Sequence, residues 1–262
     1  MANTRPRRRK PGTPVIVRAL CQAFSIHILV FGLLLASTEA AAQPLPLTSR
    51  ALLAATPADL TRLLESARPF PLSASQTAVV LNSLPKKGEV TDLDSPSRQK
   101  LLALTAVLQA AKRESLYVIK IVDVPAAIVG LHARTVILIS QTALTLLAAD
   151  ELRALVAHEI GHDYVWADRE LAMAYADTTH LQDLELVCDI LAIVTLHTAG
   201  HDGSRLISGL EKLLRFNRER FGPADNESAY PTLARRRAVA RAVEAEFEST
   251  PIAAMGTLGA AR

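Results

Sequence analysis

The stretch Val156–Tyr164 (VAHEIGHDY) constrains this chain more than any other, because it holds His158, Glu159 and His162 in the order His-Glu-x-x-His. On an α-helix, residues four apart differ by about 40° in direction and about 6 Å in height. Both imidazoles therefore face the same side of the helix and can bind one metal ion. The stretch predicts a helix with a metal site on one face.

Zinc suits this set of side chains, because it binds imidazole nitrogens and carboxylate oxygens, and a catalytic zinc site uses three protein ligands and a water. Glu159 lies next to the first ligand and can reach that water as a general base. We expect one Zn²⁺ per chain, with His158 and His162 as two of its ligands. The five-residue pattern is only moderately specific by itself, since a soluble helix can carry it by chance.

The first 42 residues are typical of an export signal. A basic start is followed by the apolar run Ala19–Ser37 and then by Ala40-Ala41-Ala42, which fits a small-residue cleavage site. We expect cleavage after Ala42 and a periplasmic or secreted protein. The alternative is an uncleaved inner-membrane anchor, since residues 19–37 are enough to span a bilayer.

Removal of residues 1–42 changes the charge balance of the chain. The whole sequence has 29 Lys and Arg and 26 Asp and Glu, and this segment carries six of the basic and one of the acidic residues. The remaining 220 residues have 23 basic and 25 acidic side chains, a net charge of −2. This balance gives no reason to expect a nucleic-acid partner.

Two cysteines are present, Cys21 and Cys188. Cys21 leaves with the signal, so we expect no disulfide within the mature monomer. Cys188 is predicted to be a small buried hydrophobe. Metal ligation by its thiolate is the alternative.

The residue patterns predict an α+β fold that is mostly α, with a small sheet next to the metal-binding helix. Residues 43–96 hold seven of the 14 prolines, so 43–95 is predicted to be an N-terminal region of short helices and turns. The metal-binding domain is expected at 96–250 and a flexible tail at 251–262. Apart from a longer helix that starts at Ser95, the expected elements are strands at 116–122 and 135–139 and helices at 143–149, 150–164, 181–199, 204–219 and 231–248.

Two positions compete for the third metal ligand. Glu185 lies on the helix predicted at 181–199, and Asp189, one turn further on, can accept a hydrogen bond from the outer N–H of a ligating histidine. Asp168 lies six residues after His162, and a different class of zincins has its third zinc ligand at this spacing. That arrangement needs a turn at Val165, and a β-branched residue suits a positive φ poorly. We therefore favour Glu185, with Asp189 behind it.

Three runs of this sequence together resemble the M48 family of zinc metalloendopeptidases, including its periplasmic members, over about Lys112–Arg241. The runs are VILISQTALTLL, DELRALVAHEIGH and LELVCDILAIVTLHTAG. The resemblance implies a zincin-like fold and protein or peptide substrates, and it leaves peripheral membrane association open. The residues that it assigns are His158, His162 and Glu185 as zinc ligands, Glu159 as general base and Asp189 as the aspartate of an ExxxD motif.

Later in the chain, Tyr230-Pro231 stands where the family often has His-Pro, and Arg236 follows at the matching distance. The family histidine is associated with stabilising the oxyanion, and a tyrosine can also donate a hydrogen bond to it. By resemblance, Tyr230 and Arg236 therefore join the catalytic residues. The alternatives are a packing role for Tyr230 at a helix start and a solvated position for Arg236.

The resulting hypothesis is a zinc-dependent endopeptidase of the cell envelope. The alternative is a zinc-binding quality-control or chaperone-like factor with little or no activity, although such a protein has no need of Glu159. His180 and His197 have no ligand spacing with the motif. His201 is expected to be structural and His132 to lie in a loop before the strand at 135–139.

Overall fold

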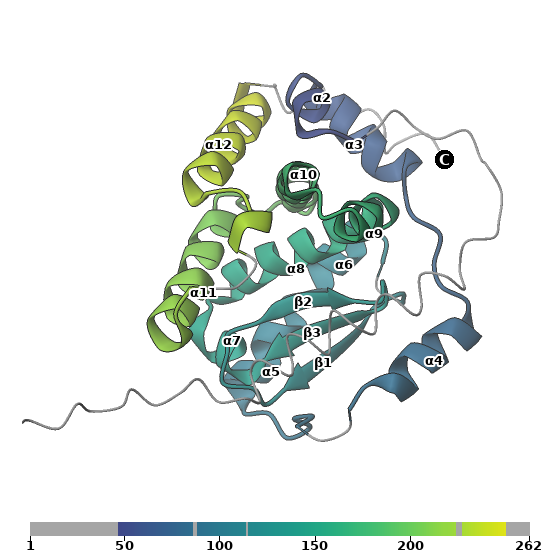
Figure 1. The fold of residues 1–262 in the computed structure, drawn as a ribbon, viewed down its shortest axis with the longest axis vertical. Coiled ribbons are helices and arrows are strands. Elements are labelled where there is room, and N and C mark those ends of the chain that lie inside the picture. Colours follow the sequence, from purple (N-terminus) through teal and green to yellow (C-terminus); the bar gives the residue numbers. More distant parts are fainter. Residues whose placement is uncertain (1–46, 86–87, 114, 224–226, 250–262) are drawn as a thin grey trace, which may run out of the picture. The chain divides into compact units, whose positions relative to one another are not determined.

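The computed structural model describes residues 47–85, 88–113, 115–223 and 227–249 (Figure 1). The expected signal at 1–42 and the expected tail at 251–262 lie outside the described residues. Within the described ranges, no helix is both long enough and apolar enough to cross a membrane.

The fold is mostly helical with one small sheet, which confirms the predicted α+β class. The strands are β1 (Val118–Val122), β2 (Val129–His132) and β3 (Val136–Ser140). The helices of the N-terminal half are α2 (Ser49–Leu53), α3 (Pro57–Ser66), α4 (Ala74–Ser83), α5 (Ser95–Leu102) and α6 (Thr105–Ala110). Those of the C-terminal half are α7 (Gln141–Leu146), α8 (Ala149–Tyr164), α9 (Trp166–Ala174), α10 (Thr178–Thr198), α11 (Arg205–Phe221) and α12 (Leu233–Ser249), with the 3₁₀ turn η1 (Glu227–Ala229) before α12.

The sheet has the strand order β1-β3-β2, with β1 parallel and β2 antiparallel to the central strand β3. Every residue of β3 is buried, as its apolar sequence predicts. Ile137 and Ile139 face the main core, whereas Val136 and Leu138 pack with Val80 of α4. The sheet is therefore covered on both faces.

The edge strand β2 was not predicted, and the expectation of a loop at His132 was wrong because His132 ends this strand. Its four residues, VGLH, are too short to show a period of two. The strand at 136–140 lies in the centre of the sheet, and β2 is the strand beside α8 (Figure 1).

The expected long helix from Ser95 is two helices, α5 and α6. The apolar pattern runs through the break, because Leu104 and Leu108 are both buried on the same side. At the break the carbonyl of Ala103 accepts a hydrogen bond from Arg153 Nε at 3.0 Å. In a continuous α-helix the N–H of Val107 would donate to this carbonyl, but here it donates to the carbonyl of Leu104. A contact from the distant helix α8 thus lies at the point where the predicted single helix is interrupted.

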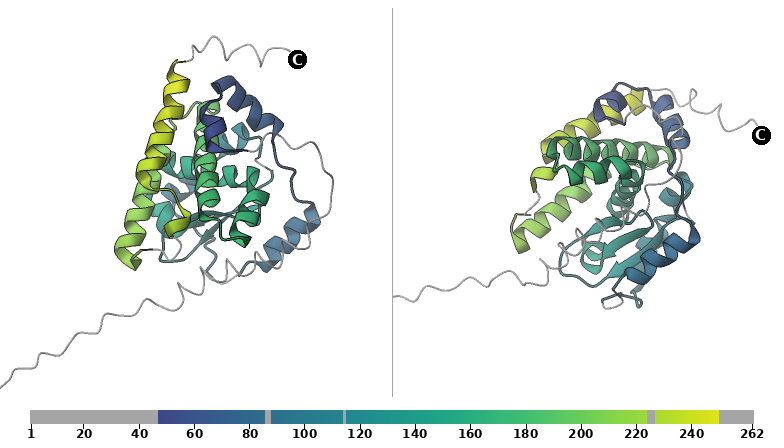
Figure 2. Two further views of the ribbon diagram at one scale, coloured as in Figure 1. Left: turned by 45° about the horizontal axis from the view of Figure 1, so that its top comes forward. Right: turned by 45° about the vertical axis from the view of Figure 1, so that its right-hand side comes forward.

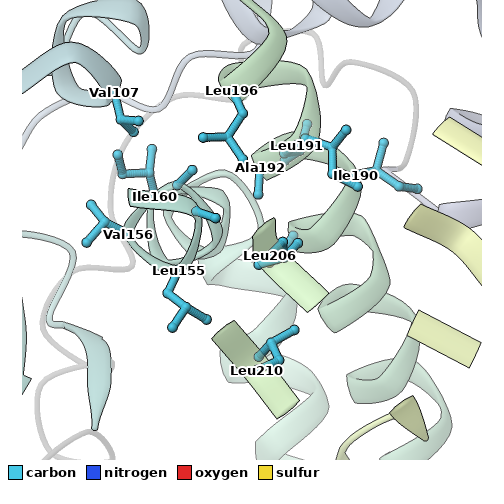
Figure 3. Close-up of a cluster of buried hydrophobic side chains, with 14 of the residues drawn as sticks. Val107, Leu155, Val156, Ile160, Ile190, Leu191, Ala192, Leu196, Leu206 and Leu210 are labelled. Carbon is cyan, nitrogen blue, oxygen red and sulfur yellow. The ribbon is translucent and has the colours of Figure 1, made fainter. Parts of the chain in front are cut away.

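The core is built around α8 and α10, which lie next to each other on the side of α8 away from the sheet (Figure 1). Thirteen consecutive residues of α10, from Leu184 to Leu196, are buried. Figure 3 shows Leu155, Val156 and Ile160 of α8 beside apolar side chains of α10 and α11. Helices α11 and α12 also pack on each other, as further views show (Figure 2).

Helices α8 and α10 approach each other closely at Gly161. A Cβ atom there would lie 3.0 Å from the Cα atom and 3.1 Å from the carbonyl oxygen of Cys188. Both are backbone atoms, so a larger residue would have to push the two helices apart. Gly161 is therefore needed for the spacing of the central helix pair.

We expect Gly161→Ala to lower the free energy of unfolding by about 1–3 kcal/mol, which is typical of overpacking a core. The matched control is Gly130→Ala in β2, where an added Cβ would meet nothing within 4 Å. Thermal and urea unfolding of both variants and the parent would measure the effect. Equal stability of the two variants would show that the contact between α8 and α10 is not tight.

Candidate metal centre

Helix α8 is fixed at its first turn by Glu151, which is 4% exposed. One oxygen of Glu151 accepts a hydrogen bond from the N–H of Ala148 at 2.9 Å and from Lys212 of α11 at 2.7 Å. The other oxygen accepts from Ser208, also on α11, at 2.7 Å. The start of α8 is thereby capped and tied to α11.

The end of α8 is held by Asp163, directly after the second histidine of the motif. Its carboxylate accepts hydrogen bonds from Tyr117 Oη at 2.9 Å and from Arg134 Nε at 2.7 Å. Tyr117 precedes β1, and Arg134 lies in the turn between β2 and β3. These bonds connect the end of the helix to segments that flank the strands of the sheet.

Three buried donor groups converge between α8 and α10. Nε2 of His158 lies 3.4 Å from Oε2 of Glu185, and Nε2 of His162 lies 3.6 Å from Oε1 of the same carboxylate. The two imidazole rings are almost perpendicular, with centroids 4.8 Å apart. His158, Glu159 and His162 also offer ligand atoms within 4.8 Å of one another. Two imidazoles and one carboxylate are a donor set that zinc binds.

Asp189 contacts the outer nitrogen of His158. Nδ1 of His158 lies 3.0 Å from Oδ1 of Asp189, which leaves Nε2 free to act as a ligand. Burial lowers the pKa of His158, but the hydrogen bonds and charges of Asp189 and Glu185 outweigh it and raise the value to about 9. This imidazole is held in a strongly negative environment that favours a cation.

Arg236 binds the other side of Asp189. Its Nε and one terminal nitrogen donate to the two carboxylate oxygens at 2.8 and 2.6 Å. Arg236 is only 4% exposed, so the alternative of a solvated residue is wrong. Burial would raise the pKa of Asp189, but the charge of Arg236 and hydrogen bonds from His158 and Arg236 keep it below its usual value.

The outer nitrogen of His162 has a different partner, which sequence reasoning missed. Sγ of Cys188 lies 3.3 Å from Nδ1 of His162, and Cys188 is completely buried. Burial and the charge of Glu185 raise the pKa of the thiol well above its usual value. The sulfur therefore faces the outer side of the ring as a neutral group. Its place between Glu185 and Asp189 was the only signal for this contact in the sequence.

Glu159 lies on the side of α8 that faces the sheet. Its Oε2 accepts a hydrogen bond from the N–H of Leu131 in β2 at 2.8 Å. Burial, opposed by the charge of His158, raises the pKa of Glu159 to about 6. A carboxylate with such a pKa exchanges protons readily near neutral pH.

The remaining candidates differ in their positions. Tyr230 follows η1 and is 40% exposed. Desolvation and then the charge of Glu185 raise its pKa to about 12, so its hydroxyl is a hydrogen-bond donor at neutral pH. Asp168 is an exposed residue of α9, and Val165 has a φ of −111°, without the turn that a ligand at 168 would need.

Outside these groups, two further histidines have structural contacts. His197 Nε2 pairs with Glu244 at 2.6 Å, and Nδ1 of His201 lies 3.3 Å from Arg153. These contacts agree with the predicted structural role of His201.

In a comparison with protein families, residues 95–218 match the model of peptidase family M48. The matched range contains the histidine motif, Glu185 and Asp189, and it ends before Tyr230 and Arg236. Comparison with curated protein sequences gives no match.

The third ligand can be tested by metal content. We expect Glu185→Ala to lose zinc, because Glu185 faces both Nε2 atoms, and Asp168→Ala to keep it. Asp189→Asn should weaken zinc binding by about 10–100-fold, as changes behind a ligand usually do. Mass spectrometry of the dialysed proteins would measure bound zinc. Full zinc in Glu185→Ala together with loss in Asp168→Ala would contradict the arrangement described above.

Proposed function

We propose that this chain, whose residues 95–218 match the model of peptidase family M48, is a zinc-dependent endopeptidase that hydrolyses peptide bonds in proteins. Members of this family are zinc enzymes. The observation that carries the proposal is the convergence of both Nε2 atoms on the Glu185 carboxylate, with Glu159 beside them. His158, His162 and Glu185 would hold the ion.

The bound zinc would polarise the scissile carbonyl and lower the pKa of a water. Glu159 accepts the proton of the attacking water and then donates it to the leaving amine, a pair of transfers that its raised pKa suits. Asp189 keeps the proton of His158 on Nδ1 and so directs the Nε2 lone pair toward the metal.

Tyr230 and Arg236 have separate roles in this proposal. The hydroxyl of Tyr230 remains protonated at neutral pH and donates a hydrogen bond to the developing oxyanion. Arg236 is bound through two nitrogens to Asp189. We therefore assign to Arg236 the positioning of Asp189 and, through it, of His158, in place of the contact with the oxyanion that the resemblance implied.

The edge strand β2 supports a peptide as substrate. The carbonyl of Ile128 accepts a hydrogen bond from Ser140 N at 2.9 Å, so residue 128 faces β3. Main-chain groups alternate in direction along an antiparallel pair, and those of Val129 and Leu131 face away from β3. The N–H of Leu131 binds Glu159. The carbonyl of Leu131 and both groups of Val129 can therefore pair with an extended peptide beside the metal ligands.

The second candidate function is a zinc-binding factor of the cell envelope with little or no activity. It needs the same ligands but no base. A half-buried carboxylate beside both histidines, with a pKa raised toward neutrality, supports the enzyme instead.

Glu159→Gln separates these two candidates. The variant should keep zinc, because residue 159 is not one of the three ligands, and it should keep the bond from Leu131, because a glutamine oxygen also accepts it. Cleavage of casein should fall by about 10²–10⁴-fold, as expected for loss of a general base. The parent should lose activity with a chelator and regain it with zinc. Equal cleavage by the variant and the parent would exclude the proposed mechanism.

We further propose that the protein acts in the cell envelope after cleavage of its N-terminal signal. Protein recovered from the envelope should begin at Gln43, because Ala40-Ala41-Ala42 fits a cleavage site. Intact-mass analysis would measure this. A full-length chain in the membrane fraction would instead support an anchor at residues 19–37.

A further inference from the structure

The segment that leads into β2 is bound by a side chain from a distant helix. Asn217 of α11 accepts a hydrogen bond from the N–H of Ala127 at 2.9 Å through Oδ1. Its Nδ2 donates to the carbonyl of the same residue at 2.8 Å. One amide side chain thus satisfies both main-chain groups of Ala127, as a neighbouring β-strand would.

These bonds fix the end of the sheet where β2 begins. Ala127 is 2% exposed, and the N–H of the next residue, Ile128, donates to Ser140 Oγ at 2.9 Å. Helix α11 passes beside this end of the sheet (Figure 1) and is itself bound to the start of α8 through Glu151. Asn217 therefore connects the edge strand to α11 and, through α11, to the helix that carries His158 and His162.

We propose that Asn217 is a positioning residue for the peptide substrate, because it sets the position of the β2 main chain relative to the metal ligands. The inference depends on the proposed function, since it concerns the strand along which the peptide would bind. Val129, whose two main-chain groups face away from β3, lies only two residues after Ala127. A shift of Ala127 would move these groups away from an extended peptide.

The metal ligands do not depend on this contact. His158 and His162 come from α8 and Glu185 from α10, and their outer partners are Asp189 and Cys188. Loss of the Asn217 bonds should therefore weaken peptide binding and leave zinc content unchanged. Loss of a residue that only stabilised the fold would change peptide binding and zinc content together.

Asn217→Asp is the sharpest variant, because it has the same shape but cannot donate to the carbonyl of Ala127, and it places a negative charge beside that oxygen. Asn217→Ala removes both bonds. The matched control is Arg215→Ala, an exposed position on the same helix. We expect both Asn217 variants to raise the KM for a protein or peptide substrate about tenfold, as expected from one or two lost hydrogen bonds. Their kcat should stay within about twofold of the parent, because the three ligands and Glu159 are carried by α8 and α10 and not by β2.

Two zinc-binding probes test the same point without turnover. Acetohydroxamate binds only the metal, whereas a peptide-extended hydroxamate also needs β2. Calorimetry on the zinc-loaded proteins should show unchanged affinity for the first probe and about tenfold weaker affinity for the second in both Asn217 variants. Arg215→Ala should match the parent with both probes.

The inference is overturned if Asn217→Asp matches the parent in KM and in affinity for the peptide probe. It is also overturned if the variants lose zinc, or lose affinity for both probes equally, because Asn217 would then support the metal site or the fold as a whole. A different outcome is that the Asn217 variants bind the peptide probe more weakly than the parent, but the parent cleaves no peptide. That result would refute the proposed endopeptidase and leave the positioning role standing.

Discussion

The close packing of α8 on α10 is the constraint on which the rest of the structure depends. It places the histidines of one helix opposite the carboxylate of the other, at Nε2–oxygen distances of 3.4 and 3.6 Å. The absence of a side chain at Gly161 permits this approach. Buried ionisable groups are costly unless they are paired, and here Glu185, His158, Asp189 and Arg236 form a continuous chain of opposite charges and hydrogen bonds.

The two histidines differ in what lies behind them. His158 has a carboxylate at Nδ1, and its pKa is raised to about 9. His162 has only a neutral thiol at Nδ1, and burial lowers its pKa to about 3. The same motif on one helix therefore holds one imidazole that favours a positive charge and one that stays neutral. Burial lowers the pKa of both imidazoles, and it is outweighed at His158 by the hydrogen bonds and charges of Asp189 and Glu185.

The small sheet contributes to the site through its edge. Strand β2 binds Glu159 by a main-chain N–H and turns other main-chain groups away from β3. Glu159 and the outward-facing edge of β2 are thus fixed to each other, since the N–H of Leu131 on that edge donates to the Glu159 carboxylate. Asn217 and Ser140 hold the beginning of this strand, which links its position to α11 and to the central strand.

Patterns local to the chain were enough to predict α8, α10, α11 and α12 and the fold class, since each of these helices carries its own apolar pattern or motif. The histidine motif and the spacing of Glu185 and Asp189 pointed to one metal site, because helical geometry alone sets which side chains share a face. Strand β2 could not be predicted, because four residues with a glycine carry no period, and only pairing with β3 makes them a strand.

The sequence by itself therefore determined which groups can carry the chemistry, and the tertiary structure decided what each group contacts. The contacts of Cys188 with His162, Arg236 with Asp189, and Asn217 with Ala127 join residues 26, 47 and 90 positions apart. The resemblance singled out Arg236, but the charge pattern of the run Arg235-Arg236-Arg237 does not show which arginine binds a buried carboxylate or that Arg235 stays exposed. Packing settles the difference, because a buried charge must find its partner within the fold.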